Sequence, residues 1–247
     1  MSEIHSILFV GHILFGAAAL VLFWIPVMTK KGQLNHINFG RYYSTAMYAV
    51  ALTGALMASL VLLSPSIHAQ WATAEQLTPE IVSAIRTQAG FLLYLSLVSF
   101  ASTRHGMAVL EAKADRQQLR TFIYIAPLVL LVLGGAVCFY VGWQTNRTLL
   151  MVFGVLGIVI GSGMLRYCLR DSIKRNQWVL EHLGAMIGSG IGAYTAFIAF
   201  GGRTLFSGLG MWQIAFWIAP GVIGGIAANV IATHYAKKLK LAQQPSL

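Results

Sequence analysis

Seven long segments of the chain are almost free of charged residues. Only 10% of all residues are charged, against about 25% in a typical soluble domain. An apolar segment of roughly 20 residues is long enough to cross a bilayer as a helix. The pattern predicts an all-α polytopic membrane helix bundle with seven transmembrane helices, folded as one domain over residues 1–247. The predicted spans are about residues 4–28, 38–63, 85–103, 121–141, 148–169, 180–200 and 211–235.

The basic residues predict how these segments are oriented. If the segments alternate in direction, 14 of the 17 Lys and Arg residues fall on one side, and only Arg86, Arg147 and Arg203 fall on the other. Basic loops remain in the cytoplasm, so we predict an outer N-terminus and a cytoplasmic C-terminus in a bacterial inner (plasma) membrane. The formal net charge of +10 follows this loop pattern, and we therefore expect a lipid bilayer and no nucleic acid as partner.

Four of the seven histidines lie close to the predicted cytoplasmic boundary, each on a different segment. Ionisable side chains inside a membrane are costly and commonly mark functional sites. We therefore predict a histidine cluster near the cytoplasmic face, although histidines that only bind headgroups or backbone carbonyls would give the same pattern. A fifth histidine, His12, lies about 12 Å along the first helix. The four boundary residues are His36, His105, His182 and His234.

The first functional hypothesis is a b-type haem that transfers electrons in the membrane. Imidazoles on facing helices are its usual axial ligands, and a glycine four residues after His36 and after His12 would leave room for a porphyrin edge. Arg41 and Arg104 can pair with the haem propionates, or serve only as positive-inside charges. A quinone or another membrane protein would be the electron partner. The predicted haem-binding residues are His12, His36, His105, His182, His234, Arg41 and Arg104.

Three alternatives stay open, and the sequence does not decide whether the chain is an enzyme. The first is a zinc-dependent membrane hydrolase, since imidazoles with an open water position suit catalytic zinc. The second is a proton-coupled transporter or sensor that uses histidine protonation, and the third is an accessory subunit of a membrane complex. The predicted zinc-site residues are His36, His105, His182 and His234, with Glu181 as a nearby carboxylate or general base.

Small and polar residues recur in the later segments. Glycines stand four residues apart at Gly184, Gly188 and Gly192, at Gly157 and Gly161, and at Gly221 and Gly225. This spacing allows helices to approach closely, or leaves room for a flat cofactor. Asn229 is a polar residue within the last segment, suited to hydrogen bonding between helices or to lining a polar cavity. The cysteines Cys138 and Cys168 fall near opposite membrane faces, so no disulfide is expected.

Two stretches carry a family resemblance. The first contains His12-x3-Gly16, Lys30-Lys31-Gly32 and His36-x3-Gly40-Arg41-x-Tyr43. The second contains Trp178-x3-His182-x3-Met186-Ile-Gly-Ser189 and Ala193-x-Thr195-Ala-Phe197. Together they resemble a family of bacterial multi-pass membrane proteins described only as predicted membrane proteins with a domain of unknown function. This resemblance implies a membrane fold and no particular activity.

Weaker resemblances concern two other groups of membrane proteins. The histidine in one helix, the basic loop and the histidine opening the next helix are similar to two-haem membrane b-type cytochromes. Those proteins place histidine pairs at both faces, whereas four of the five candidates here lie on one side. The helix count is similar to that of seven-helix zinc hydrolases, but their last helix carries paired histidines and this chain has only His234 there.

Overall fold

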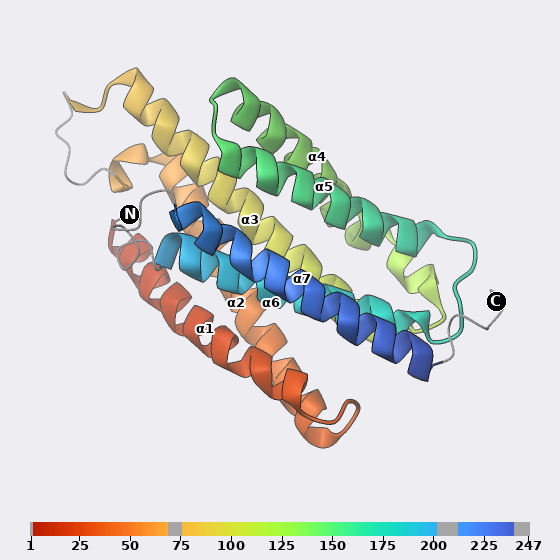
Figure 1. The fold of residues 1–247 in the computed structure, drawn as a ribbon. Coiled ribbons are helices and arrows are strands. Elements are labelled where there is room, and N and C mark those ends of the chain that lie inside the picture. The colour runs from red at the N-terminus through yellow and green to blue at the C-terminus, as the bar shows by residue number, and fades with distance from the viewer. Residues whose placement is uncertain (1, 69–75, 202–211, 240–247) are drawn as a thin grey trace.

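The computed structural model describes residues 2–68, 76–201 and 212–239, with the side chains of 212–218 left undescribed. These residues form helices joined by short turns and contain no β-strand, which confirms the all-α prediction (Figure 1). The long helices are α1 (Ser2–Met28), α2 (Leu34–Leu63), α3 (Pro79–Ala112), α4 (Phe122–Gln144), α5 (Thr148–Leu169), α6 (Gln177–Ala196) and α7 (Trp212–Lys238). The short elements are the 3₁₀ turns η1 (Pro65–Ile67) and η3 (Arg116–Arg120) and the π turn η4 (Phe197–Gly201).

Six helices among the described residues, α1 to α6, are long and apolar enough to cross a membrane. These are the helices of a multi-pass membrane protein, because a soluble domain has no use for six such exposed apolar surfaces. The seventh predicted span coincides with α7, and its passage through the bilayer stays a prediction.

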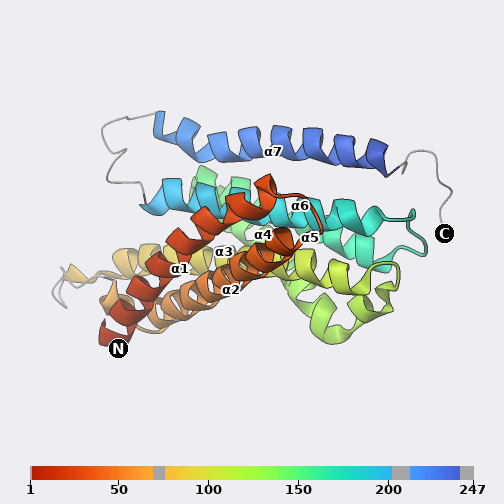
Figure 2. The same cartoon turned by 90° about the horizontal axis from the view of Figure 1, so that it is seen from below.

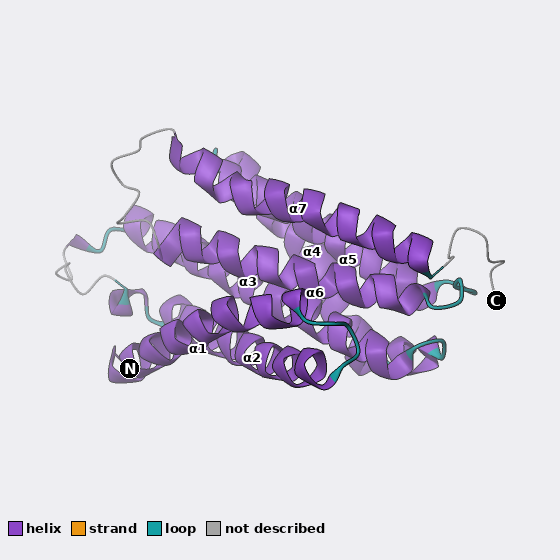
Figure 3. Ribbon diagram, turned by 60° about the horizontal axis from the view of Figure 1, so that its bottom comes forward, coloured by secondary structure: helices purple, strands orange, loops and turns teal. Residues whose placement is uncertain are grey.

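Successive helices run in opposite directions along the bundle (Figures 1 and 2). The turns that follow α1, α3 and α5 therefore share one end with the end of α7. We call this the basic end, because residues 29–33, 113–121 and 170–176 and the last turn of α7 carry most of the Lys and Arg residues. Helix α7 lies at the edge of the bundle, against α6 (Figures 2 and 3).

Helix ends follow local chemistry. The side chain of Thr78 accepts a hydrogen bond from the backbone N–H of Ile81 (3.5 Å), and Pro79 is the first residue of α3. The hydroxyl satisfies an N–H that the first turn leaves unpaired, and Pro has no N–H to lose there. Thr78 and Pro79 thus define the start of α3, which begins before the predicted span 85–103. Gly32 has φ +80°, which permits the tight turn between α1 and α2.

Two arginines bind the carbonyl groups at the end of α5. The buried Arg116 donates through Nη1 to the carbonyls of Tyr167 (3.0 Å) and Arg170 (2.5 Å), and through Nη2 to that of Asp171. Arg120 donates to the carbonyls of Cys168 and Arg170. The last carbonyls of a helix lack partners within it and carry partial negative charge. Sequence reasoning placed these arginines only as loop charges.

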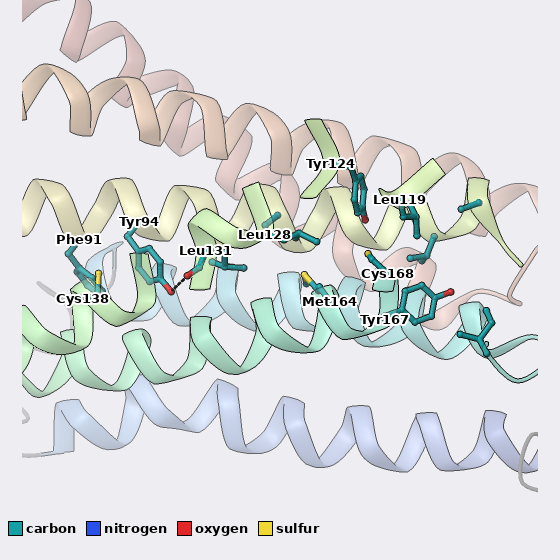
Figure 4. Close-up of a cluster of buried hydrophobic side chains, with 14 of the residues drawn as sticks. Phe91, Tyr94, Leu119, Tyr124, Leu128, Leu131, Cys138, Met164, Tyr167 and Cys168 are labelled. Atoms are coloured by element: carbon teal, nitrogen blue, oxygen red, sulfur yellow. Dashed lines mark hydrogen bonds between the residues drawn. The ribbon is translucent and has the colours of Figure 1, made fainter. Parts of the chain in front are cut away.

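The larger core joins α3, α4 and α5 (Figure 4). The Tyr94 hydroxyl donates to the carbonyl of Leu131 (3.2 Å) and lies directly against Gly157. Where α4 and α5 cross, a Cβ added to Gly154 would come within 2.7 Å of the Gly135 carbonyl oxygen. The glycines at this crossing therefore let the two helices approach until their backbones touch. Cys138 and Cys168 are buried and unbonded, as expected.

The smaller core joins α1, α2 and α6. Tyr43 is 1% exposed, and its hydroxyl is 2.8 Å from Ser189 Oγ. Ser189 Oγ already donates to the Met186 carbonyl, so Tyr43 donates to Ser189. Gly190 leaves room for the Phe23 ring. This bond and this packing attach α6 to the α1–α2 pair.

The remaining glycine stripes face outward. Gly184, Gly188 and Gly192 on α6, and Gly221 and Gly225 on α7, are exposed, and an added Cβ at any of them would meet nothing within 4 Å. Their four-residue spacing does not serve packing among the described residues.

Candidate histidine site at the basic end

His182 is oriented by a backbone carbonyl of a neighbouring helix. Its Nδ1 is 2.7 Å from the carbonyl oxygen of Gly106 in α3. A carbonyl oxygen only accepts hydrogen bonds, so Nδ1 carries the proton. The other ring nitrogen, Nε2, has no hydrogen-bond partner among the described residues. In the neutral ring it presents a free lone pair.

His36 is held in the same way by α1. Its Nδ1 donates to the carbonyl of Pro26 (3.0 Å), one turn from the end of that helix. Lys31 Nζ donates to the carbonyls of Pro26 (2.7 Å) and Val27 (2.6 Å), so the cation and the imidazole cap α1 together. Burial lowers the pKa of the Lys31 ammonium from its ordinary value. Like His182, His36 keeps Nε2 without a partner among the described residues.

The rings of His36 and His182 contact each other edge-on. Their centroids are 6.5 Å apart, and the ring planes form an angle of 78°. Both side chains are half-buried. Two imidazoles, one from α2 and one from α6, thus meet at the basic end. A carbonyl of α1 fixes the first, and a carbonyl of α3 fixes the second. We call them the histidine pair.

His105 is fully engaged in a different set of bonds. It is 1% exposed, with Nε2 3.0 Å from Glu181 Oε1 and Nδ1 2.7 Å from the Tyr124 hydroxyl. Nε2 donates to the carboxylate, and in a neutral ring Nδ1 accepts the tyrosine proton. The Tyr167 ring packs edge-on against the imidazole, with centroids 5.7 Å apart. His105 therefore has no free nitrogen to offer a cofactor.

These bonds form two adjacent links between α3 and α6. His105 contacts Glu181, and the next residue on each helix, Gly106 and His182, forms the second link. Because the links are consecutive, they fix the register of α6 against α3 and with it the orientation of His182. Glu181, predicted as a nearby carboxylate or general base, is bonded to His105 in this arrangement.

The other predicted residues lie apart from the histidine pair. His234 is exposed on α7, beside the ring of Tyr235. His12 lies 2.9 Å from Thr53 Oγ1, and Thr53 is 17 residues from His36, about 25 Å along α2. Depth along the helix separates His12 from the pair. His234 lies on α7, which packs against α6, but it makes no hydrogen bond or ring contact with either member of the pair among the described residues.

Of the two predicted arginines, one is bound to a neighbouring helix and the other is exposed. Arg104 donates to the Ile123 carbonyl (3.0 Å) and lies over the Tyr124 ring, 4.8 Å from its centroid. These contacts commit its guanidinium to α4. Arg41, five residues after His36, is exposed. Only Arg41 is left to bind an anionic group of a ligand.

The two histidines suit a group that takes two protein ligands better than they suit catalytic zinc. Catalytic zinc needs three protein ligands and a water. Within the described ranges, no group of three His, Cys, Asp or Glu side chains is placed to share a metal ion. An added Cβ at Gly40, one turn after His36, would meet nothing within 4 Å.

Sequence reasoning missed the partners that orient the site. The carbonyls of Pro26 and Gly106 carry no side-chain signature, so no motif could have revealed them. Tyr124 carried a weak signal, because a tyrosine one turn inside the basic end of α4 is well placed to meet a buried polar group.

Comparisons with protein-family models, with curated proteins and with solved structures find no match to this chain. The multi-pass membrane fold and the histidine pair are therefore the features on which a function can be argued.

Proposed function

We propose that His36 and His182 are the two axial ligands of a b-type haem, and that the protein transfers electrons within the membrane. In this proposal all seven long helices cross the bilayer, with the basic end in the cytoplasm. The haem would lie between α2 and α6, close to that end.

The separation of the two rings carries the proposal. Metal–imidazole bonds are about 2 Å long, and the ring centre lies about 1 Å beyond the nitrogen, so two axial imidazoles place their centroids about 6 Å apart. The observed 6.5 Å agrees with this spacing. Directly packed aromatic rings span about 4.5 to 7 Å, so the distance alone would also suit simple contact.

The hydrogen bonds of the two rings add support for a bound metal. Histidines that bind a metal commonly donate their other N–H to a carbonyl or carboxylate, which fixes the tautomer and strengthens the ligand. Both His36 and His182 donate Nδ1–H to a carbonyl. A haem iron would bind the Nε2 that this shared tautomer leaves free in each ring.

A bound haem would supply one-electron chemistry, and this chain would supply the ligands and their surroundings. Arg41 is free to pair with a propionate. An electron partner that reaches the basic end, a quinone or another membrane protein, completes the proposal.

The test is a dithionite-reduced minus oxidised absorption spectrum of the full chain, purified in detergent from cells supplied with a haem precursor. We expect a sharp α band and about one haem per chain by pyridine haemochrome assay. Metal analysis of the same sample serves as the control for other ions. A flat spectrum with the protein folded and helical would contradict the haem proposal, and zinc in that sample would favour a hydrolase instead.

A further inference from the structure

Asn229 is a polar side chain without a partner on the outer surface of α7. It is exposed, and none of its hydrogen-bonding atoms is engaged within the part of the chain that the structure describes. Its surroundings on α7 are apolar, with Val222, Ile223, Ile226 and Val230 exposed by 52 to 67%. In hydrocarbon an amide with no partner costs several kcal/mol.

The depth of Asn229 makes water an inadequate partner. Nine residues separate it from Lys238, which corresponds to about 14 Å along the helix axis. The hydrocarbon core is about 30 Å thick, so Asn229 falls near its centre if α7 spans the bilayer, as proposed above. A group from another helix must then supply the hydrogen bond.

The residues around Asn229 suit a second helix. Gly221, Gly225, Asn229 and Thr233 recur every four residues and are all exposed. An added Cβ at Gly221 or Gly225 would meet only open space. A neighbouring helix can therefore approach the backbone of α7 along this stripe, and close approach is what small residues provide in membranes.

We propose that α7 pairs with α7 of a second copy of this chain, with Asn229 hydrogen-bonded to its counterpart. Two copies with the same topology are related by a two-fold axis along the membrane normal, so each residue meets its equivalent at the same depth. An amide has both donors and an acceptor and can pair with itself. Neither a lysine nor an arginine could do so, because each has only donors.

The proposal is tested by the oligomeric state of the full chain in lipid bilayers, measured by single-molecule photobleaching of a fluorescent fusion over a range of protein-to-lipid ratios. Asn229→Leu should weaken dimerisation about tenfold, and Gly225→Ile should weaken it at least as much. Asn229→Gln should restore the dimer, because it keeps the amide. Ile223→Ala, on another side of the same helix, should leave dimerisation unchanged.

Each result of the dimerisation measurements either supports or overturns the α7 pairing. Leucine is more apolar than asparagine and favours membrane insertion, so loss of the dimer in Asn229→Leu does not arise from failure to insert. A wild-type chain that remains monomeric, or a dimer indifferent to Asn229→Leu, overturns the proposal. A haem spectrum measured on the same samples reports the histidine pair separately, so the two proposals fail independently.

Discussion

At the scale of single residues, the histidines differ in how many ring nitrogens are engaged. His105 uses both, whereas His36 and His182 each use Nδ1 and keep Nε2 free among the described residues. The sequence shows only that a histidine lies near a helix end. That position does not tell whether one or both of its ring nitrogens are engaged. The sequence could locate four histidines near one boundary, but the partners that decide their roles lie on other helices.

The first prediction concerns the histidine pair. His36→Ala and His182→Ala should each abolish haem binding, since a single imidazole leaves one axial position empty. Haem content per folded chain measures the effect. His12→Ala is the matched control and should keep full occupancy, because His12 bonds Thr53 far from the pair. Full haem content in both pair variants would rule out His36 and His182 as ligands.

The second prediction concerns the buried arginine at the end of α5. Arg116→Met should destabilise the protein by about 2 kcal/mol or more, because three carbonyls lose a charged donor in a buried place. Unfolding of the detergent-solubilised protein in SDS would measure this. Arg175→Met replaces an exposed arginine in the segment between α5 and α6 and should change stability by less than about 0.5 kcal/mol. If both variants lost the same stability, the loss would come from the removed charge and not from the carbonyl groups that Arg116 binds.

At the scale of helices, most bounds could be predicted closely, but α3 (Pro79–Ala112) extends beyond the predicted 85–103 at both ends. The packing of the helices could not be predicted. The segment 148–169 coincides with α5, and Thr78-Pro79 marks the start of α3. These features depend on local composition and capping. The glycine stripes looked alike in the sequence, yet Gly157 contacts Tyr94 while Gly184, Gly188 and Gly192 face outward. Which stripe is buried depends on which helices are neighbours.

The third prediction tests the crossing of α4 and α5. Gly154→Ala should cost about 1 to 3 kcal/mol, because its Cβ would come within 2.7 Å of the Gly135 carbonyl oxygen and the Phe139 nitrogen. Gly163→Ala, on the same helix with nothing within 4 Å, should be neutral or stabilise by up to about 1 kcal/mol. The measurement is again SDS unfolding. Similar stabilities for the two variants would mean that the helices separate without cost.

At the scale of the whole molecule, the alternating helices place the basic loops together, but which side of the membrane they occupy is set by the charge bias alone. The fourth prediction is that Ser66→Cys reacts with an impermeant thiol reagent added to intact cells, while Lys113→Cys reacts only after permeabilisation. Both positions are exposed, at opposite ends. The native cysteines are buried and serve as the unlabelled background. The reverse labelling pattern would invert the topology.

The unequal lengths of the helices tie the protein to the thickness of its bilayer. Helix α5 has 22 residues, about 33 Å, which nearly matches a hydrocarbon core of about 30 Å. Helix α3 has 34 residues, about 51 Å, and must tilt or project into the headgroups. Gly106, which orients His182, lies in the last two turns of α3. Lipids with shorter tails will therefore bring the histidine pair closer to water, and lipids with longer tails will draw it inward.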